Sequence, residues 1–138
     1  VLDLYAGSGA LGLEALSRGA ASALLVESDS TAAGVARANA RALGLAGATV
    51  CAGAVERIVA SARWCRPVDL VLADPPYELP AAHLAGILAR LAEGWLVPGA
   101  LIVIERSGRD EPWAWPDPIE AVQHRSYGDT ALWYGRRP

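Results

Sequence analysis

The sequence has no lysine, only two cysteines and no apolar run of the length that a membrane span needs. A spanning helix takes about 18 or more consecutive apolar residues, so no membrane association is expected. Cys51 and Cys65 form neither a CxxC pair nor a metal-binding spacing, which argues against a zinc or redox site. We interpret both as small buried apolar side chains in a reducing, cytoplasmic compartment, and we expect no metal.

Positive charge is also scarce. All 12 basic residues are arginine against 15 acidic residues, for a net charge of −3 and a pI of about 5.3. A protein that holds a polyanion by charge alone has the opposite sign, so strong autonomous binding to RNA is not expected. The missing lysine, beside abundant alanine, is better explained by codon composition than by function.

The remaining composition is typical of one compact domain. The chain has 138 residues, of which 53% are hydrophobic and 20% charged; this is enough for a real core and too little for two ordinary domains. A disordered chain is excluded by the abundance of apolar side chains. No internal repeat or linker is visible.

Apolar runs alternate with stretches of helical period along the chain. Continuous apolar runs favour parallel strands that are buried on both faces, and the Gly128-Asp129 pair favours a closing hairpin. The predicted strands cover residues 1–5, 23–26, 48–51, 68–73, 100–105, 119–127 and 130–135, and the predicted helices cover 31–43, 55–62 and 81–91. The expected fold is α/β, a doubly wound, mostly parallel sheet with an antiparallel C-terminal hairpin.

A glycine-rich turn, Gly7 to Gly12, follows the first predicted strand and opens a helix. Such a turn lets a ligand approach backbone N–H groups at a helix N-terminus. Glu27 ends the next strand, where an acid can bind ribose hydroxyls. A dinucleotide-binding domain would show both features, and a tight turn without a ligand would explain the glycines alone.

Asp3 favours a different ligand. An acid inside the first strand is costly to bury without a partner, and the ammonium group of a bound amino acid would be such a partner, whereas a pyrophosphate would be repelled. The alternative is a carboxylate that is satisfied by amides of the loop.

Asp74-Pro75-Pro76-Tyr77 directly follows the predicted strand 68–73. It therefore lies at the carboxyl edge of the sheet, where open α/β sheets bind ligands. Two prolines stiffen the turn and remove N–H donors, which leaves Asp74 and the Pro75 carbonyl as acceptors for an amine. Methylation of cytosine at carbon 5 would instead require a cysteine nucleophile in a comparable loop, and neither cysteine is there.

The stretch from Asp3 to Gly9, together with Glu27, resembles the cofactor motifs of class I methyltransferases, which have a Rossmann-like fold. The resemblance implies S-adenosylmethionine as the cofactor, with the loop around its methionine part and the acid on its ribose. The stretch that would contact adenine, residues 51–55, lacks the family's acid, so only Ala54 is assigned there. The implied cofactor-binding residues are Asp3, Tyr5, Ala6, Gly7, Ser8, Gly9, Glu27, Ser28 and Ala54.

The Asp-Pro-Pro-Tyr motif resembles the signature of methyltransferases that act on exocyclic amines of bases. The resemblance implies that Asp74 and Pro75 hold the amine, that Tyr77 stacks on the base, and that these three residues are catalytic. Positioning and electrostatics would then supply most of the catalysis.

Over nearly its whole length the chain is similar to the RsmD-type methyltransferases, which modify guanine N2 in small-subunit (16S) ribosomal RNA. The similarity rests on residues 2–20, 74–77 and 127–130. It implies that the partner is small-subunit RNA or an assembly intermediate, and that residues 1–138 are a methyltransferase domain without the family's basic N-terminal RNA-binding extension. Asn39 also matches the family, although a surface amide is an alternative.

Other functions remain open at this point. DNA is the alternative substrate, as in adenine-N6 or cytosine-N4 methyltransferases, and a non-catalytic RNA- or nucleotide-binding domain is another possibility. We expect a monomer. Arg106 and Arg109, beside a tryptophan-rich segment, are interpreted as parts of a solvated loop rather than as contacts to RNA.

Overall fold

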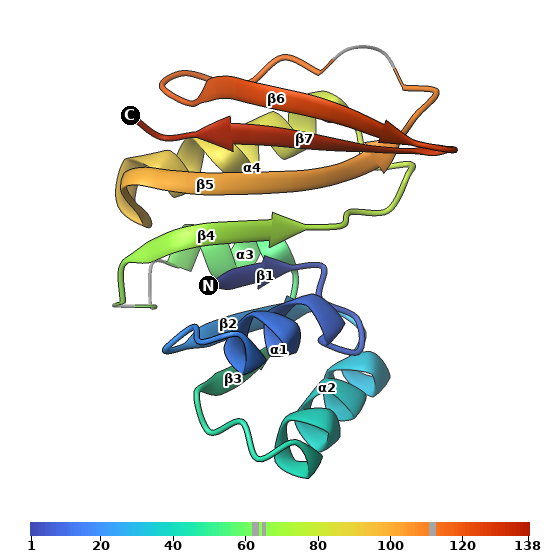
Figure 1. The fold of residues 1–138 in the computed structure, drawn as a ribbon, viewed down its shortest axis with the longest axis vertical. Coiled ribbons are helices and arrows are strands. Elements are labelled where there is room, and N and C mark those ends of the chain that lie inside the picture. The colour runs from blue at the N-terminus through green and yellow to red at the C-terminus, as the bar shows by residue number, and fades with distance from the viewer. Residues whose placement is uncertain (62–63, 65, 111–112) are drawn as a thin grey trace.

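The fold is a seven-stranded sheet covered by helices on both faces, as seen in a computed structural model that describes residues 1–61, 64, 66–110 and 113–138 (Figure 1). The strand order is β3-β2-β1-β4-β5-β7-β6. The first five of these strands run parallel, whereas β7 is antiparallel to both β5 and β6. The strands are β1 (Leu2–Leu4), β2 (Ala23–Glu27), β3 (Ala48–Ala52), β4 (Val68–Ala73), β5 (Leu96–Ser107), β6 (Glu120–Tyr127) and β7 (Thr130–Arg136). The predicted fold class is confirmed.

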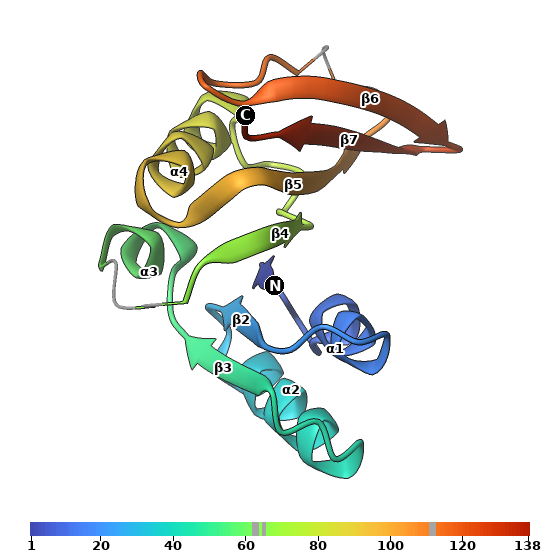
Figure 2. The same cartoon turned by 60° about the vertical axis from the view of Figure 1, so that its left-hand side comes forward.

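The helices divide into two pairs, one on each face of the sheet (Figure 2). They are α1 (Ala10–Ser17), α2 (Ser30–Ala42), α3 (Val55–Ser61) and α4 (Ala81–Gly94). The Asp29 side chain caps α2 by accepting a hydrogen bond from the Thr31 N–H at 3.1 Å. After α2 the chain leaves the helix at Gly44, whose φ of 67° is the left-handed conformation of a helix end.

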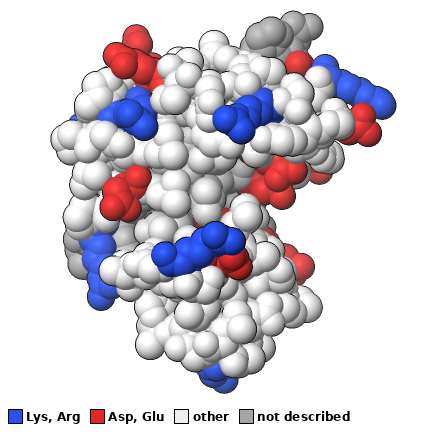
Figure 3. Space-filling model, viewed as in Figure 1, with Lys and Arg blue, Asp and Glu red and all other residues white. Residues whose placement is uncertain are grey.

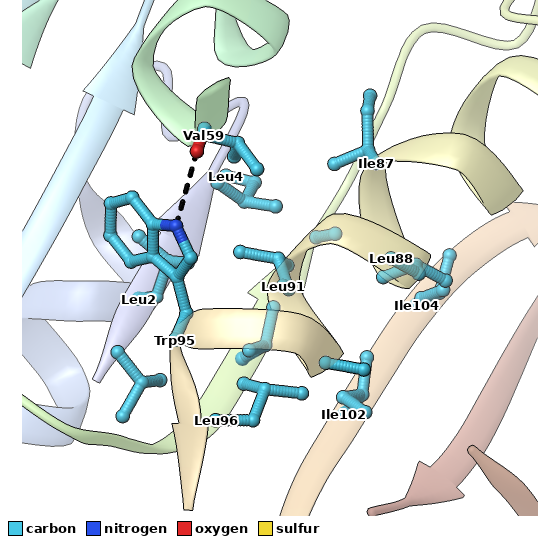
Figure 4. Close-up of a cluster of buried hydrophobic side chains, with 14 of the residues drawn as sticks. Leu2, Leu4, Val59, Ile87, Leu88, Leu91, Trp95, Leu96, Ile102 and Ile104 are labelled. Atoms are coloured by element: carbon cyan, nitrogen blue, oxygen red, sulfur yellow. Dashed lines mark hydrogen bonds between the residues drawn. The ribbon is translucent and has the colours of Figure 1, made fainter. Parts of the chain in front are cut away.

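The larger apolar core lies between the sheet and the α3/α4 pair (Figure 4). Trp95, which directly follows α4, is buried in this core and donates its indole N–H to the Val59 carbonyl on α3 at 3.1 Å. Leu2 and Leu4 of β1 are fully buried against this cluster. Burial of each such leucine contributes about 1.5–3 kcal/mol, so the middle of the sheet is a firm support for the loops at its edge.

Both ends of β5 (Leu96–Ser107) lie outside the predicted strand 100–105. The Pro98-Gly99 pair was expected to turn the chain before the strand, but it lies inside β5, which begins at Leu96. The pairing with β4 accommodates it through an irregularity, since Val68 pairs with Leu96 while Leu70 pairs with Leu101. The Pro98-Gly99 signal thus appears as an irregularity within the strand, where Gly99 has a left-handed φ of 86°, rather than as a turn before the strand.

Two further observations concern membranes and cysteine. None of the helices in the described ranges combines the length and apolar character that crossing a bilayer requires. Cys51 is a free thiol, half-buried beside the α3/α4 core. The prediction for Cys65 falls outside the described residues.

Candidate active site

The glycine-rich loop connects β1 to α1 and is held in place by contacts to β2 and α2. The Gly7 N–H donates to Glu27 Oε1 at 2.8 Å, and the Asn39 side chain donates to the Ser8 carbonyl at 3.0 Å. Gly9 has a φ of 86°, and a Cβ there would lie 2.7 Å from Leu25 Cδ2. The loop thus has its shape before any ligand arrives, and glycine is required at its closest approach to β2.

Glu27 ends β2 as predicted and is fixed from two sides. Its second oxygen, Oε2, accepts the Asp29 N–H at 2.8 Å, in addition to the bond from Gly7. A carboxylate has about four acceptor positions, so two remain for hydroxyl groups of a ribose. The side chain is half-buried and accessible, which suits that role.

Asp3 is almost completely buried, with 1% of its surface exposed. Its Oδ2 accepts a hydrogen bond from the Gly12 N–H at 2.9 Å. The alternative interpretation, in which amides of the loop satisfy the carboxylate, is therefore correct for one of its two oxygens. Burial raises the pKa of Asp3 to about 6, with smaller contributions from the neighbouring carboxylates Asp74 and Glu27. One amide therefore does not fully compensate the charge, and an ammonium group beside Asp3 would.

The other predicted cofactor residues occupy different surroundings. The Tyr5 ring packs against the α3/α4 core, where burial and Glu56 raise its pKa to about 12. Its hydroxyl has no hydrogen-bond partner among the residues that the structure describes. Its contribution to a ligand would thus come from the backbone. Ala6 packs against a smaller apolar cluster on the other face of the sheet, which includes Leu13 of α1 and Ala36 of α2. Ser28 is exposed directly after β2, and Ala54 precedes α3 close to the end of β3.

The Asp-Pro-Pro-Tyr turn begins where β4 ends. Asp74 is exposed, Pro75 is buried, and Tyr77 presents 63% of its surface to solvent. The turn is closed by the Leu79 N–H, which donates to the Pro76 carbonyl at 3.0 Å. Partial burial raises the pKa of Asp74, which makes its carboxylate a better proton acceptor.

A buried arginine anchors the far end of this turn. Arg106 on β5 is 7% exposed; its Nη1 donates to the Leu79 carbonyl at 3.1 Å, and its Nε lies 3.4 Å from Asp110 Oδ2. The interpretation of Arg106 as part of a solvated loop was therefore wrong, whereas the side chain of Arg109 is 85% exposed.

The strand ends bring these groups to one edge of the sheet. Leu4 of β1, Ala73 of β4 and Ile104 of β5 stand in one row of the sheet, so Asp74 and Glu105 follow on adjacent strands. Figure 3 shows the surface hollowed beside these strand ends, with acidic side chains along the hollow. The sequence interpretation did not single out Glu105, because its closeness to Asp74 depends on the β4–β5 register. No group of three or more potential metal ligands occurs in the part of the chain that the structure describes.

Comparison with known proteins places this geometry in a family. A family described as conserved hypothetical protein 95 matches residues 1–136. The "Ribosomal RNA small subunit methyltransferase D" of Haemophilus influenzae is 32% identical over 136 residues, which cover 92% of this chain and 66% of that protein. The protein of the same name from Escherichia coli K12 is 41% identical over 111 residues, covering 75% and 51%. The chain belongs to this RsmD-type family.

Solved structures agree with the RsmD-type fold. A putative methyltransferase from Escherichia coli superposes with a TM-score of 0.83 at 30% identity, over 99% of this chain and 75% of that one. A conserved hypothetical protein of Streptococcus pyogenes gives a TM-score of 0.86 at 26% identity, over 99% and 84%. The RsmD-type chain described here spans about half to two thirds of the length of its curated relatives.

Proposed function

We propose that this chain transfers a methyl group from S-adenosylmethionine to the exocyclic N2 amine of a guanine in small-subunit (16S) ribosomal RNA. Membership of the RsmD-type family supports the proposal, as do the names of the curated relatives. The observation that carries it is the placement of the Asp74 to Tyr77 turn, one strand away from the glycine-rich loop. An acceptor of an amine thus adjoins a loop suited to the cofactor.

The residues on the β1–β2 side of the site fit S-adenosylmethionine. Asp3 is a buried carboxylate whose Oδ1 suits an ammonium group, and the free acceptor positions of Glu27 suit ribose hydroxyls. Backbone of the loop from Tyr5 to Gly9 would surround the methionine part. When bound, the cofactor supplies a methyl group on a positively charged sulfur.

The residues on the β4 side fit a base with an amino group. Asp74 and the Pro75 carbonyl accept the two N–H groups, which turns the nitrogen lone pair toward the methyl carbon. Stacking of the base on the exposed Tyr77 contributes about 1–3 kcal/mol. The amine nitrogen would release one proton on accepting the methyl group, and the Asp74 carboxylate on the turn would accept that proton.

The proposal is tested with the full-length protein, labelled S-adenosylmethionine and small ribosomal subunits, or their RNA, from cells that lack the modification. Mass spectrometry of the nucleosides after digestion should detect N2-methylguanine. A parallel reaction on DNA addresses the alternative substrate: N6-methyladenine or N4-methylcytosine there, with no product on RNA, would replace the proposal. Any 5-methylcytosine would contradict the mechanism itself.

A further inference from the structure

Glu105 is a second carboxylate at the proposed substrate side of the site. It lies near the end of β5, pairs across the sheet with Leu132 of β7, and is half-buried. The preceding residue, Ile104, is buried in the α3/α4 core. Because successive side chains of a strand point to opposite faces, the Glu105 side chain lies on the other face of the sheet.

Glu105 and Asp74 are neighbours across adjacent strands. Their preceding residues, Ile104 and Ala73, are register partners in the parallel β4–β5 pair, and such strands lie about 4.8 Å apart. The Asp74 charge contributes to raising the pKa of Glu105, after the larger effect of burial. The two carboxylates therefore lie close together at this edge of the sheet.

Neither carboxylate is neutralised by a basic side chain. The ion pairs found among the described residues involve neither Asp74 nor Glu105. Two adjacent carboxylates without a cation repel each other, and a ligand that donates hydrogen bonds to both would relieve the repulsion. Such a ligand needs two neighbouring donor groups on one edge.

Among the bases with an exocyclic amine, guanine alone has this edge. Its N1–H donor lies beside the N2 amine, whereas the amines of adenine and cytosine lie beside a ring nitrogen that accepts. An ionised carboxylate facing that ring nitrogen would be repelled by its lone pair. A site that reads the Watson–Crick edge of a base by hydrogen bonds would thus use a second acceptor to select guanine.

We propose that Glu105 is a specificity-determining residue that accepts a hydrogen bond from guanine N1–H while Asp74 and Pro75 hold the N2 amine. The inference rests on the proposed function, since it assigns the choice of base at that same site. Glu105 lies on the side of Asp74 away from β1, the strand that leads into the glycine-rich loop. Arg106, held to the Leu79 carbonyl, keeps the end of β5 aligned with the turn.

The test compares guanine with 2-aminopurine, which keeps the N2 amine but has an unprotonated N1. Small-subunit RNA ligated with either base at the methylated position is presented to the full-length protein, as RNA and after assembly into subunits. The parent protein should favour guanine in kcat/KM by about ten- to a hundredfold, the range expected for a lost hydrogen bond to a charged acceptor. Equal rates on the two bases would overturn the proposal without any variant.

Two variants separate base reading from a structural role. The amide of Glu105→Gln can donate to the unprotonated N1, so the preference for guanine should shrink toward one. Glu105→Asp keeps the charge and should keep the preference at a lower rate. Both should bind S-adenosylmethionine like the parent, and Glu120→Gln on the edge strand β6 is the matched control.

The outcomes distinguish the two proposals. In one outcome, the parent protein methylates guanine N2 while Glu105→Gln changes the rates on guanine and 2-aminopurine by the same factor, or changes neither rate. In either case Glu105 does not select the base, and the proposed function stands. If the parent forms no N2-methylguanine on either form of the RNA, the proposed function fails and the assignment of Glu105 fails with it.

Discussion

Replacing Asp3 by asparagine should make the ligand-free protein more stable and its cofactor binding weaker. Asp3 is buried in β1, and within the described ranges its side chain accepts one hydrogen bond, from the Gly12 N–H. Its pKa in the folded protein is about 6, against a usual value of 3.8. Asparagine keeps an oxygen for Gly12 and removes the charge.

The sign and size of the effect follow from that pKa. Between about pH 4 and pH 6 the folded protein holds a proton on Asp3 that the unfolded chain has released, so the free energy of unfolding falls as pH rises. The difference in pKa corresponds to about 3 kcal/mol, lost in full above pH 7. The variant should escape this loss, but its buried amide N–H groups need partners at a cost of about 1–3 kcal/mol, which reduces the gain to about 0–2 kcal/mol.

Cofactor binding should show the opposite effect. An ammonium group beside Asp3 favours the charged carboxylate, so the parent should bind S-adenosylmethionine more tightly as pH rises through 6. The asparagine variant should lose most of this pH dependence and bind about ten- to a hundredfold more weakly at pH 7. Higher stability and weaker cofactor binding in the same variant would show that the Asp3 carboxylate lowers the stability of the ligand-free protein and strengthens ligand binding.

Denaturant unfolding without cofactor, from pH 4 to pH 8, measures the first effect, and calorimetric titration with S-adenosylmethionine over the same range measures the second. Asp69→Asn, an exposed aspartate on the neighbouring strand β4, is the matched control. If Asp3→Asn has a lower free energy of unfolding than the parent at pH 8, burial of the charged Asp3 carboxylate does not destabilise the parent as argued. If the cofactor affinity is unchanged, the only role of Asp3 is to accept the hydrogen bond from the Gly12 N–H of the loop.

Three further substitutions test other parts of the molecule. Glu27→Ala should weaken S-adenosylmethionine about ten- to a hundredfold in calorimetry, while Glu14→Ala on the exposed face of α1 should not, and equal affinities would remove Glu27 from the site. Asp74→Ala should abolish methyl transfer in a single-turnover assay while the cofactor still binds; transfer at the parent rate would make the turn merely structural. Trp95→Phe should lower the free energy of unfolding by about 1–3 kcal/mol, because the buried Val59 carbonyl loses its donor; a denaturation curve equal to that of the parent would contradict this.

Most of the fold could be predicted because its signals are local. The apolar run at 68–73 coincides with β4, and the Gly128-Asp129 turn joins β6 to β7 as expected. The glycine-rich loop and the acid ending β2 were likewise visible as short motifs, and the structure brings Gly7 and Glu27 into contact. Whether these residues bind the cofactor stays a prediction.

Non-local pairing accounts for what the sequence did not reveal. Glu105 ends an apolar run in the same manner as Glu27, but only the β4–β5 register places it beside Asp74. The sequence favoured a surface amide for Asn39, whereas the structure shows that its side chain donates to the Ser8 carbonyl, 31 residues away. Contacts between residues distant in sequence leave no periodic trace in the chain.

The strand order has a consequence for how such a protein can change its substrate. Residues before 62 form the half of the sheet with the glycine-rich loop and Glu27, and residues from 66 onward form the half with Asp74 and Glu105. Within the sheet, the two halves are joined by the pairing of β1 with β4, which comprises three residue pairs. Under the proposed function, substitutions in the second half should alter the methyl acceptor with little effect on cofactor binding, except at Asp74, whose charge reaches Asp3. Residues of β1 and β4 that pair across the join contact both halves, so substitutions there should affect both.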